Sequence, residues 1–202
     1  MNSRLHIVKQ QFIEAAGLLQ RFIDDPRQWE AFEQAGELMV QAVRQGHRIY
    51  ACGNGGSMCD AMHFAEEMTG RFRKNRKPYP AMAIGDAAHL TCTANDYGYD
   101  QIFARHVEAF GAAGDILLAI STSGNSANIL KAVEAGRRKG MHVIALTGKT
   151  GGELAGCCDV ELRAPKSAWS DRAQEIHIKI IHALILYTEL SIDPELYDAT
   201  GN

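Results

Sequence analysis

Five short apolar runs, each followed by a segment with helical spacing, constrain the fold of this chain more than any other feature. The runs are RIYAC (48–52), PAMAI (80–84), DILLAIS (115–121), HVIALTG (142–148) and DVELRAP (159–165). Apolar spacing predicts helices near 57–70, 99–110, 125–139, 151–156 and 169–191. Strands that alternate with helices favour an α/β fold, a doubly wound five-stranded parallel sheet with right-handed crossovers.

Two further helices are expected before the first strand, over 5–24 and 27–45, where apolar residues recur at helical spacing. Pro26 suits the start of the second helix and Gly46 its end. A chain of 202 residues is read as one domain. The expected organisation is an N-terminal helical extension (1–45), the sheet domain (46–192) and a C-terminal tail (193–202).

Composition narrows the classes of partner. The net charge is −3 with both signs interspersed, so the basic stripe of a nucleic-acid binder is missing from the sequence. No apolar run approaches the ~20 residues of a membrane span, and MNSRLHIVKQQF lacks the core of a signal peptide. The five cysteines have no zinc-site spacing and are read as reduced thiols. These features predict a cytoplasmic protein without nucleic-acid or membrane partners.

Unusual residues fill the places where strands lead into helices, which is where parallel sheets bind ligands. GNGGS (53–57) follows the first strand, TANDYG (93–98) the second, STSGNSANI (121–129) the third and TGKTGG (147–152) the fourth. Hydroxyls and N–H groups at a helix N-terminus suit a phosphate, although a serine-rich turn can also be ordinary helix capping. The loop STSGNS lacks the Lys-Ser/Thr ending of a Walker motif, which argues against a nucleoside triphosphate. The loop GNGGS lacks the GxGxxG spacing, which argues against a dinucleotide. The basic segment RFRKNRKPYP (71–80) is read as a solvated loop.

His63 and Glu67 lie four residues apart, so one helix face carries both, with Cβ atoms ~6 Å apart. Such a pair can chelate a divalent ion or work as an acid and a base, but it can also be a surface hydrogen bond. In the last helix, Gln174 and His182 are separated by ~12 Å along the axis and could share an ion only by leaning together. His177 lies ~140° around that helix from His182 and cannot share its site.

Taken together, GNGGS–CDAMHFAEE, AND, STSGNSANI, LTGK–GG and QEIHIK–IH resemble the sugar isomerase (SIS) superfamily, and within it the phosphoheptose isomerases. The resemblance runs over roughly residues 10–190, with the motifs in order. It implies conversion of D-sedoheptulose 7-phosphate to D-glycero-D-manno-heptose 7-phosphate, the entry to nucleotide-activated heptose for bacterial surface polysaccharide. It also implies a homotetramer with active sites at subunit interfaces.

The resemblance further implies the site residues. The metal ligands, for one Zn²⁺ per subunit, would be His63, Glu67, Gln174 and His182. Glu67 would be the catalytic base and His182 its proton-transferring partner. The helical angle, ~20°, places Asp171 on one face with His182, which makes Asp171 a candidate to support that ring. Substrate contacts would come from Asn54, Gly55, Gly56, Ser57, Glu67, Asn95, Asp96, Ser121, Thr122, Ser123, Ser126 and Gln174.

Two alternatives belong to other functional classes. One is a non-enzymatic SIS protein that binds the replication initiator DnaA, and the other is a sugar-phosphate sensor. Neither needs Glu67 or His182, and this chain has both, so the residues favour the isomerase. Met58 and Gly85 depart from the residues expected at those positions, which leaves the fine substrate preference open.

Overall fold

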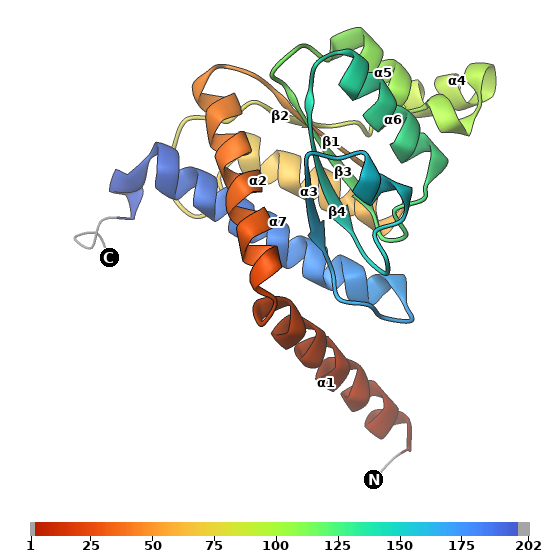
Figure 1. Cartoon of the computed structure of the whole chain (residues 1–202), viewed down its shortest axis with the longest axis vertical. Helices are drawn as coiled ribbons and strands as arrows, with labels where there is room; N and C mark the ends of the chain where they lie inside the picture. The colour runs from red at the N-terminus through yellow and green to blue at the C-terminus, as the bar shows by residue number, and fades with distance from the viewer. Residues whose placement is uncertain (1–2, 198–202) are drawn as a thin grey trace.

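A computed structural model describes residues 3–197 and contains one five-stranded sheet (Figure 1). Its order is β2-β1-β3-β4-β5, and every pair of neighbours is parallel. The strands are β1 (Ile49–Gly53), β2 (Ala81–Ala83), β3 (Ile116–Ser121), β4 (His142–Thr147) and β5 (Val160–Arg163). The prediction of a doubly wound, flavodoxin-like α/β fold is confirmed.

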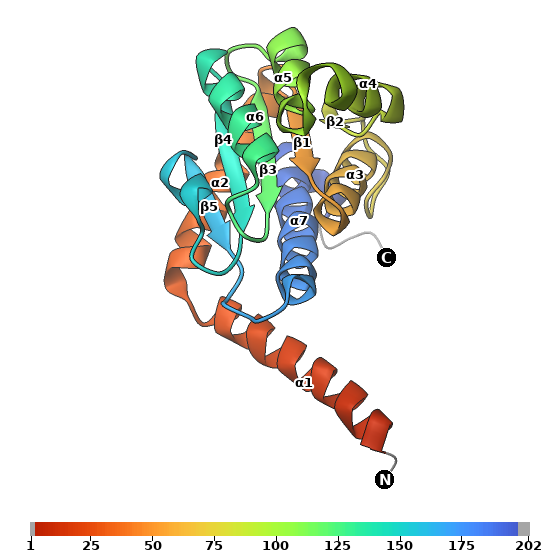
Figure 2. The same ribbon diagram turned by 90° about the vertical axis from the view of Figure 1, so that its right-hand side faces the viewer.

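Helices cover both faces of this sheet, as Figures 1 and 2 show. One layer holds α2 (Pro26–Arg44), α3 (Gly56–Thr69) and α7 (Ser170–Ile192); the other holds α4 (Ala87–Tyr97), α5 (Ala104–Phe110) and α6 (Ala127–Arg138). Within β1, Ile49 and Ala51 face the first layer, whereas Tyr50 and Cys52 face the second. This alternation follows from the two-residue period of a strand and produces two cores, one on each side. Among the described residues, three short 3-10 helices lie at Tyr99–Gln101, Glu153–Gly156 and Pro194–Leu196.

Helix α1 (Ser3–Ile23) projects away from the rest of the molecule (Figures 1 and 2). Only Leu18 and Phe22, near its C-terminal end, are buried. Five apolar side chains in its first half are more than half exposed, namely Leu5, Ile7, Val8, Phe12 and Ile13. An apolar stripe at helical spacing is typical of a helix that packs against something. Within residues 3–197, no helix has the length and apolarity needed to cross a bilayer.

The helix expected near 99–110 is present, as a 3-10 turn followed by α5, but the loop expected at 93–98 is wrong because most of it is helical. Helix α4 occupies Ala87–Tyr97, and the second helix of this region is α5, which begins at Ala104. Asp86 caps α4 by accepting a hydrogen bond from the His89 N–H at 2.8 Å. Only Thr93 of this helix is buried, so the apolar period that would have revealed it is missing.

The basic segment 71–80 is a loop, but one of its cations is not solvated. The Arg76 side chain is 1% exposed and pairs with the buried Glu189 of α7, Nε to Oε1 2.6 Å. It also donates to the backbone carbonyls of Glu67 and Met68, each at 2.8 Å. Arg76 therefore satisfies carbonyls that the C-terminal end of α3 leaves without helical partners, and it joins α3 to α7. A charge count along the sequence could not separate it from its exposed neighbours.

Candidate active site

Helices α3 and α7 bring three polar side chains together. His63 Nε2 lies 2.9 Å from His182 Nε2 and 3.5 Å from Glu67 Oε1. One donor atom from each of these residues lies within 4.8 Å of the other two. The i,i+4 spacing on α3 sets the first pair, and the packing of α7 against α3 supplies the third member.

Partial burial tunes this cluster. Desolvation raises the pKa of Glu67, and the neighbouring Glu66 carboxylate raises it further. Desolvation lowers the pKa of His182, with the positive field of His63 acting in the same direction. The Phe72 ring stacks on His182, with centroids 5.8 Å apart and 29° between planes. A carboxylate that is readier to accept a proton and an imidazole held neutral are what proton transfer near neutral pH requires.

Two carboxylates that sequence reasoning missed lie beside His63. Glu66 Oε1 is 3.3 Å from His63 Nδ1, on the side of the ring away from His182. Asp60, one turn earlier, has a buried Oδ2 without a hydrogen-bond partner among the described residues, and burial raises its pKa to about 6. A carboxylate on the second ring nitrogen orients an imidazole and increases its basicity. The signal was in the sequence, because three acidic residues lie within four positions of His63.

The cluster fits a divalent metal ion. Two imidazole nitrogens that face each other at 2.9 Å need a proton or a cation between their lone pairs. A tetrahedral zinc ion with Zn–N bonds of 2.0–2.1 Å separates its nitrogen ligands by about 3.3 Å, so a small movement of either ring makes room. Two histidines and a carboxylate are a ligand set of catalytic zinc sites, which keep a position open for substrate.

The glycine loop 53–57 is tightly built. A Cβ on Gly53 would lie 2.4 Å from Ser57 O, and Gly55 has a positive φ of 55°. The Asn54 amide exchanges hydrogen bonds with the buried Asn128 amide, at 2.9 and 2.8 Å, and accepts one from Tyr99 Oη at 3.0 Å. Sequence reasoning missed both of these partners. They hold Asn54 in place, and the Gly55–Ser57 turn leads directly into α3.

The serine loop 121–126 lies at the carboxyl end of β3, next to the glycine loop on β1. Ser121 Oγ and Ser126 Oγ are 3.1 Å apart, and Ser123 Oγ accepts from the Asn125 N–H at 3.2 Å. Ser126 precedes the first residue of α6 and makes no capping hydrogen bond with its side chain. Hydroxyls gathered at the N-terminus of a 12-residue helix are the groups that an anion site at a helix terminus uses.

Comparison with known proteins agrees with this geometry. The SIS domain model matches residues 11–148, which include the two loops, His63 and Glu67. A curated phosphoheptose isomerase from Vibrio cholerae is 54% identical over 183 residues, covering 91% of this chain and 96% of the relative. The chain belongs to the phosphoheptose isomerase family of SIS domain proteins.

Solved structures of the same family share the fold. The phosphoheptose isomerase from Neisseria gonorrhoeae has a TM-score of 0.86 and 42% identity, over 93% of this chain and 99% of that one. The one from Francisella tularensis has the same TM-score and 38% identity, over 92% and 98%. Because these matches extend beyond residue 148, they take in nearly the whole chain, whereas the SIS domain model stops before α7.

Gln174, the fourth predicted metal ligand, lies beside the glycine loop. A Cβ on Gly56 would lie 2.6 Å from both amide atoms of Gln174, so that side chain rests on the first residue of α3. His63 is seven residues further along α3, or roughly 10 Å. Metal binding by Gln174 stays a prediction.

Three further residues singled out in the sequence lie on exposed surface of α7 and α4. Asp171 is exposed in the first turn of α7, where it pairs with Arg172 at 3.1 Å, and not behind His182. Eleven residues of helix separate Asp171 from His182, which is about 16 Å. Asn95 and Asp96 are exposed near the end of α4 and bond to each other at 2.8 Å. Their contact with substrate stays a prediction.

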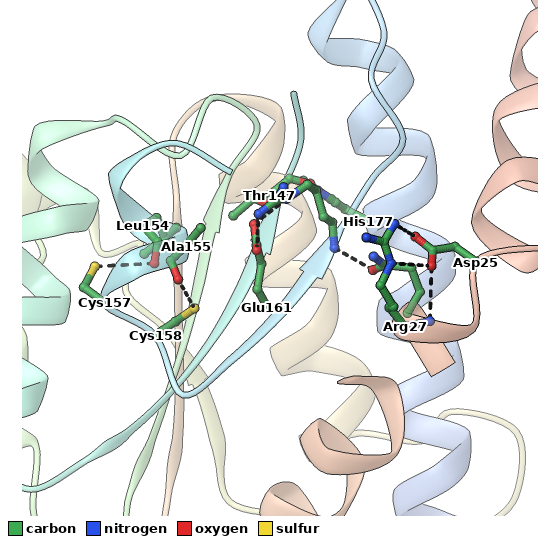
Figure 3. Close-up of polar contacts among 11 residues, drawn as sticks. Asp25, Arg27, Thr147, Leu154, Ala155, Cys157, Cys158, Glu161 and His177 are labelled. Carbon is green, nitrogen blue, oxygen red and sulfur yellow. Dashed lines mark hydrogen bonds and ion pairs between the residues drawn. The ribbon is translucent and has the colours of Figure 1, made fainter. Parts of the chain in front are cut away.

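His177 is separate from the cluster, as its helical angle predicts. It is buried against β4 and its Nε2 donates to Thr147 O at 2.7 Å (Figure 3). Desolvation lowers its pKa to about 4. An imidazole that is neutral near pH 7 and locked to the backbone is a structural group.

Proposed function

We propose that this protein converts D-sedoheptulose 7-phosphate to D-glycero-D-manno-heptose 7-phosphate, the first step toward ADP-heptose and the lipopolysaccharide core. The observation that carries this proposal is the meeting of His63, Glu67 and His182 at the α3–α7 contact. A DnaA-binding protein or a sugar-phosphate sensor would need the pocket and not these three groups. Identity of 54% to a phosphoheptose isomerase over 91% of the chain supports the same activity.

Exchange of a ketose for an aldose moves one proton between C1 and C2 and another between O1 and O2. Glu67 takes the proton from C1, which leaves a cis-enediol(ate), and returns it to C2. His182 gives a proton to the C2 oxygen and takes one from the C1 oxygen, so that the carbonyl moves to C1. The raised pKa of Glu67 makes it a stronger base than an ordinary glutamate, and the lowered pKa of His182 makes its protonated form a stronger acid.

One Zn²⁺ per subunit is proposed at the cluster, held by His63, Glu67 and His182 together with Gln174. A zinc ion at that place supplies Lewis acidity that polarises a carbonyl and stabilises negative charge on its oxygen. Glu67 has two carboxylate oxygens, so one can face His63 while the other faces the substrate carbon. Glu66 keeps the His63 ring oriented from its other nitrogen.

The loops are proposed to bind the rest of the sugar phosphate. Ser121, Thr122, Ser123 and Ser126 hold the phosphate at the N-terminus of α6. The glycine loop (Asn54, Gly55, Gly56, Ser57) and Gln174, which already touch each other, contact the sugar hydroxyls near the start of α3. Asn95 and Asp96 are proposed to reach the substrate from the end of α4.

The assembly is proposed to be a homotetramer with active sites at subunit interfaces, acting in the cytoplasm. Residues 1–45 contribute to its core through α1, whose first half exposes five large apolar side chains. Other copies of this chain cover that stripe. The five cysteines are free thiols, which suits a reducing compartment.

The test is turnover of sedoheptulose 7-phosphate by the purified, zinc-supplemented protein. Glu67→Gln should lower kcat by about 10² to 10⁴, the usual contribution of a positioned base, while sugar-phosphate binding measured by calorimetry persists. Removal of metal with a chelator should also abolish turnover.

Glu134→Gln, an exposed glutamate on α6, provides the matched control and should keep wild-type rates. Wild-type kcat in Glu67→Gln would exclude Glu67 as the base. Binding without turnover in the unaltered protein would favour the sensor.

A further inference from the structure

A cavity of about 460 Å³ lies where the junction of α1 and α2 meets the carboxyl ends of β4 and β5. Five cationic and two anionic side chains line it, an excess of three positive charges in a chain whose net charge is −3. None of the residues proposed to bind the sugar phosphate lines it. A concave surface with one sign of charge concentrates ligands of the opposite sign.

Both carboxylates in this cationic cavity are already bound. Asp25 caps α2 and accepts two hydrogen bonds from the Arg27 guanidinium, each at 2.9 Å. Glu161 accepts from Arg163 Nε at 2.8 Å and from Thr147 Oγ1 at 2.5 Å. Figure 3 shows the Asp25–Arg27 pair and the Thr147–Glu161 contact. The two acidic groups therefore neutralise their own arginines and leave the other cations of the cavity uncompensated.

Three cations remain, namely Arg21, Lys149 and Lys166. No carboxylate of residues 3–197 lies within ion-pair distance of any of the three. A group of unpaired cations repels itself and is stabilised by an anion that bridges its members. Such a bridge requires a ligand with more than one negative charge or several acceptor oxygens, as a phosphate has.

The backbone of Lys149 gives independent support. Its φ of 52° makes it the one residue other than glycine, within the described chain, that adopts a left-handed conformation. This conformation is strained for residues that have a Cβ atom, and residues held in it concentrate at ligand sites. A glycine would remove that strain, whereas a lysine here directs a charge to the cavity.

The loop that carries Lys149 also touches the serine loop. A Cβ on Gly148 would lie 2.9 Å from Thr122 O, and one on Gly124 would lie 1.8 Å from Gly151 O. The Glu153 N–H donates to Asn125 Oδ1 at 2.9 Å. An anion held by Lys149 therefore acts on the backbone that supports the proposed phosphate cradle.

We propose that the cationic cavity is a second anion site, separate from the sugar-phosphate site, and that it takes a small phosphorylated anion. Lys149 and Lys166 bind the phosphate oxygens from the ends of β4 and β5. Arg21 approaches from α1, so the ligand also ties that helix to the sheet. This site does not depend on the isomerase activity, and its test separates the two.

The test measures the rise in Tm of the full-length protein with inorganic phosphate, at constant ionic strength maintained with chloride. A ligand that binds only the folded state stabilises it in proportion to its occupancy, so the titration yields a Kd. Ser121→Ala with Ser123→Ala first weakens the sugar-phosphate site. In this background a saturable response should persist. Adding Lys149→Gln and Lys166→Gln should raise the Kd by about tenfold or more, because charge-assisted hydrogen bonds are lost.

The matched control replaces Lys131 of α6 and Lys139, the residue that follows α6, by Gln in the same serine background, which changes the net charge equally. Its Kd should stay within about twofold of the serine variant, since distant surface charges contribute little. The proposal is overturned if the double serine variant no longer shows any rise in Tm with phosphate. It is also overturned if the lysine replacements in the cavity and those in the control give the same Kd. Lys166→Gln alone provides a second variant in case the double replacement impairs folding, which circular dichroism reports.

Discussion

The two sides of α7 carry one histidine each, five residues apart, and the protein uses them in opposite ways. His177 faces β4, is fully buried and donates to Thr147 O at 2.7 Å. His182 faces α3, is partly exposed and lies 2.9 Å from His63 Nε2. The pKa of both rings is lowered by desolvation, to about 4 for His177 and by a smaller extent for His182.

The difference shows that neighbours, not residue type, decide what an imidazole does. Thr147 O can only accept, so His177 Nε2 must carry the proton, and no polar group of the described residues reaches its Nδ1. Near neutral pH the His177 ring therefore has a single protonation state and tautomer. His182 instead meets a second imidazole and a carboxylate whose protonation can change, so its proton can move.

Replacement of His182 should give the largest effect. His182→Ala removes the group proposed to transfer protons between the sugar oxygens, so kcat should fall by about 10² to 10⁴. The free energy of unfolding should change by less than about 1 kcal/mol, because the ring is partly exposed. Steady-state kinetics and urea denaturation measure the two. A stability loss that accounts for the missing activity would erase the contrast with His177.

The same change at His177 should reverse the pattern. His177→Ala leaves a cavity and an unpaired Thr147 carbonyl, which should cost about 2 to 4 kcal/mol of unfolding free energy. The kcat per folded molecule should stay near the wild-type value, since His177 touches neither the cluster nor the glycine and serine loops. Urea midpoints, with activity normalised to the folded fraction, test this. A large fall in kcat at full folding would place His177 in the chemistry.

The dependence of stability on pH should distinguish the wild type from His177→Ala. The folded-state pKa of His177 is about 4, below the ordinary value near 6.5 of an unfolded chain. Its stabilising contribution is therefore complete above pH 6.5 and declines as the pH falls toward 4, because the unfolded state takes up the proton first. Between pH 7 and pH 5 the wild type should lose about 2 kcal/mol more than His177→Ala. Parallel stability curves for the two proteins would contradict the burial argument.

The smallest effect is expected from a change in the serine loop, at the carboxyl ends of β3 and β4. Ser121 and Thr147 are paired in the register of β3 and β4. The Ser121 hydroxyl faces Ser126 of the serine loop, whereas the Thr147 carbonyl is bound by His177 of α7. Ser123→Ala should raise KM about tenfold, the loss expected for one hydrogen bond to a charged phosphate, and leave kcat nearly unchanged. Thr150→Ala, in the neighbouring loop, is the control. An unchanged KM in Ser123→Ala would remove the phosphate cradle from the serine loop.

Much of this architecture was readable from local patterns. The apolar runs predicted the five strands, and the i,i+4 spacing placed His63 and Glu67 on one helix face. Helix α4 escaped because only Thr93 of it is buried. Arg76 escaped because its partner, Glu189, is more than one hundred residues away and only packing brings the two together.

The sequence by itself determined the strands, the loops at their ends and the residue types of the site, since these depend on short periodicities and turn chemistry. Tertiary structure decided which of those residues meet. The side-by-side packing of α3 and α7 joins His182 to His63 and Glu67, and the same packing holds Gln174 on Gly56, two turns away. The distance between two helices depends on the side chains packed between them, and no spacing within one helix can specify it.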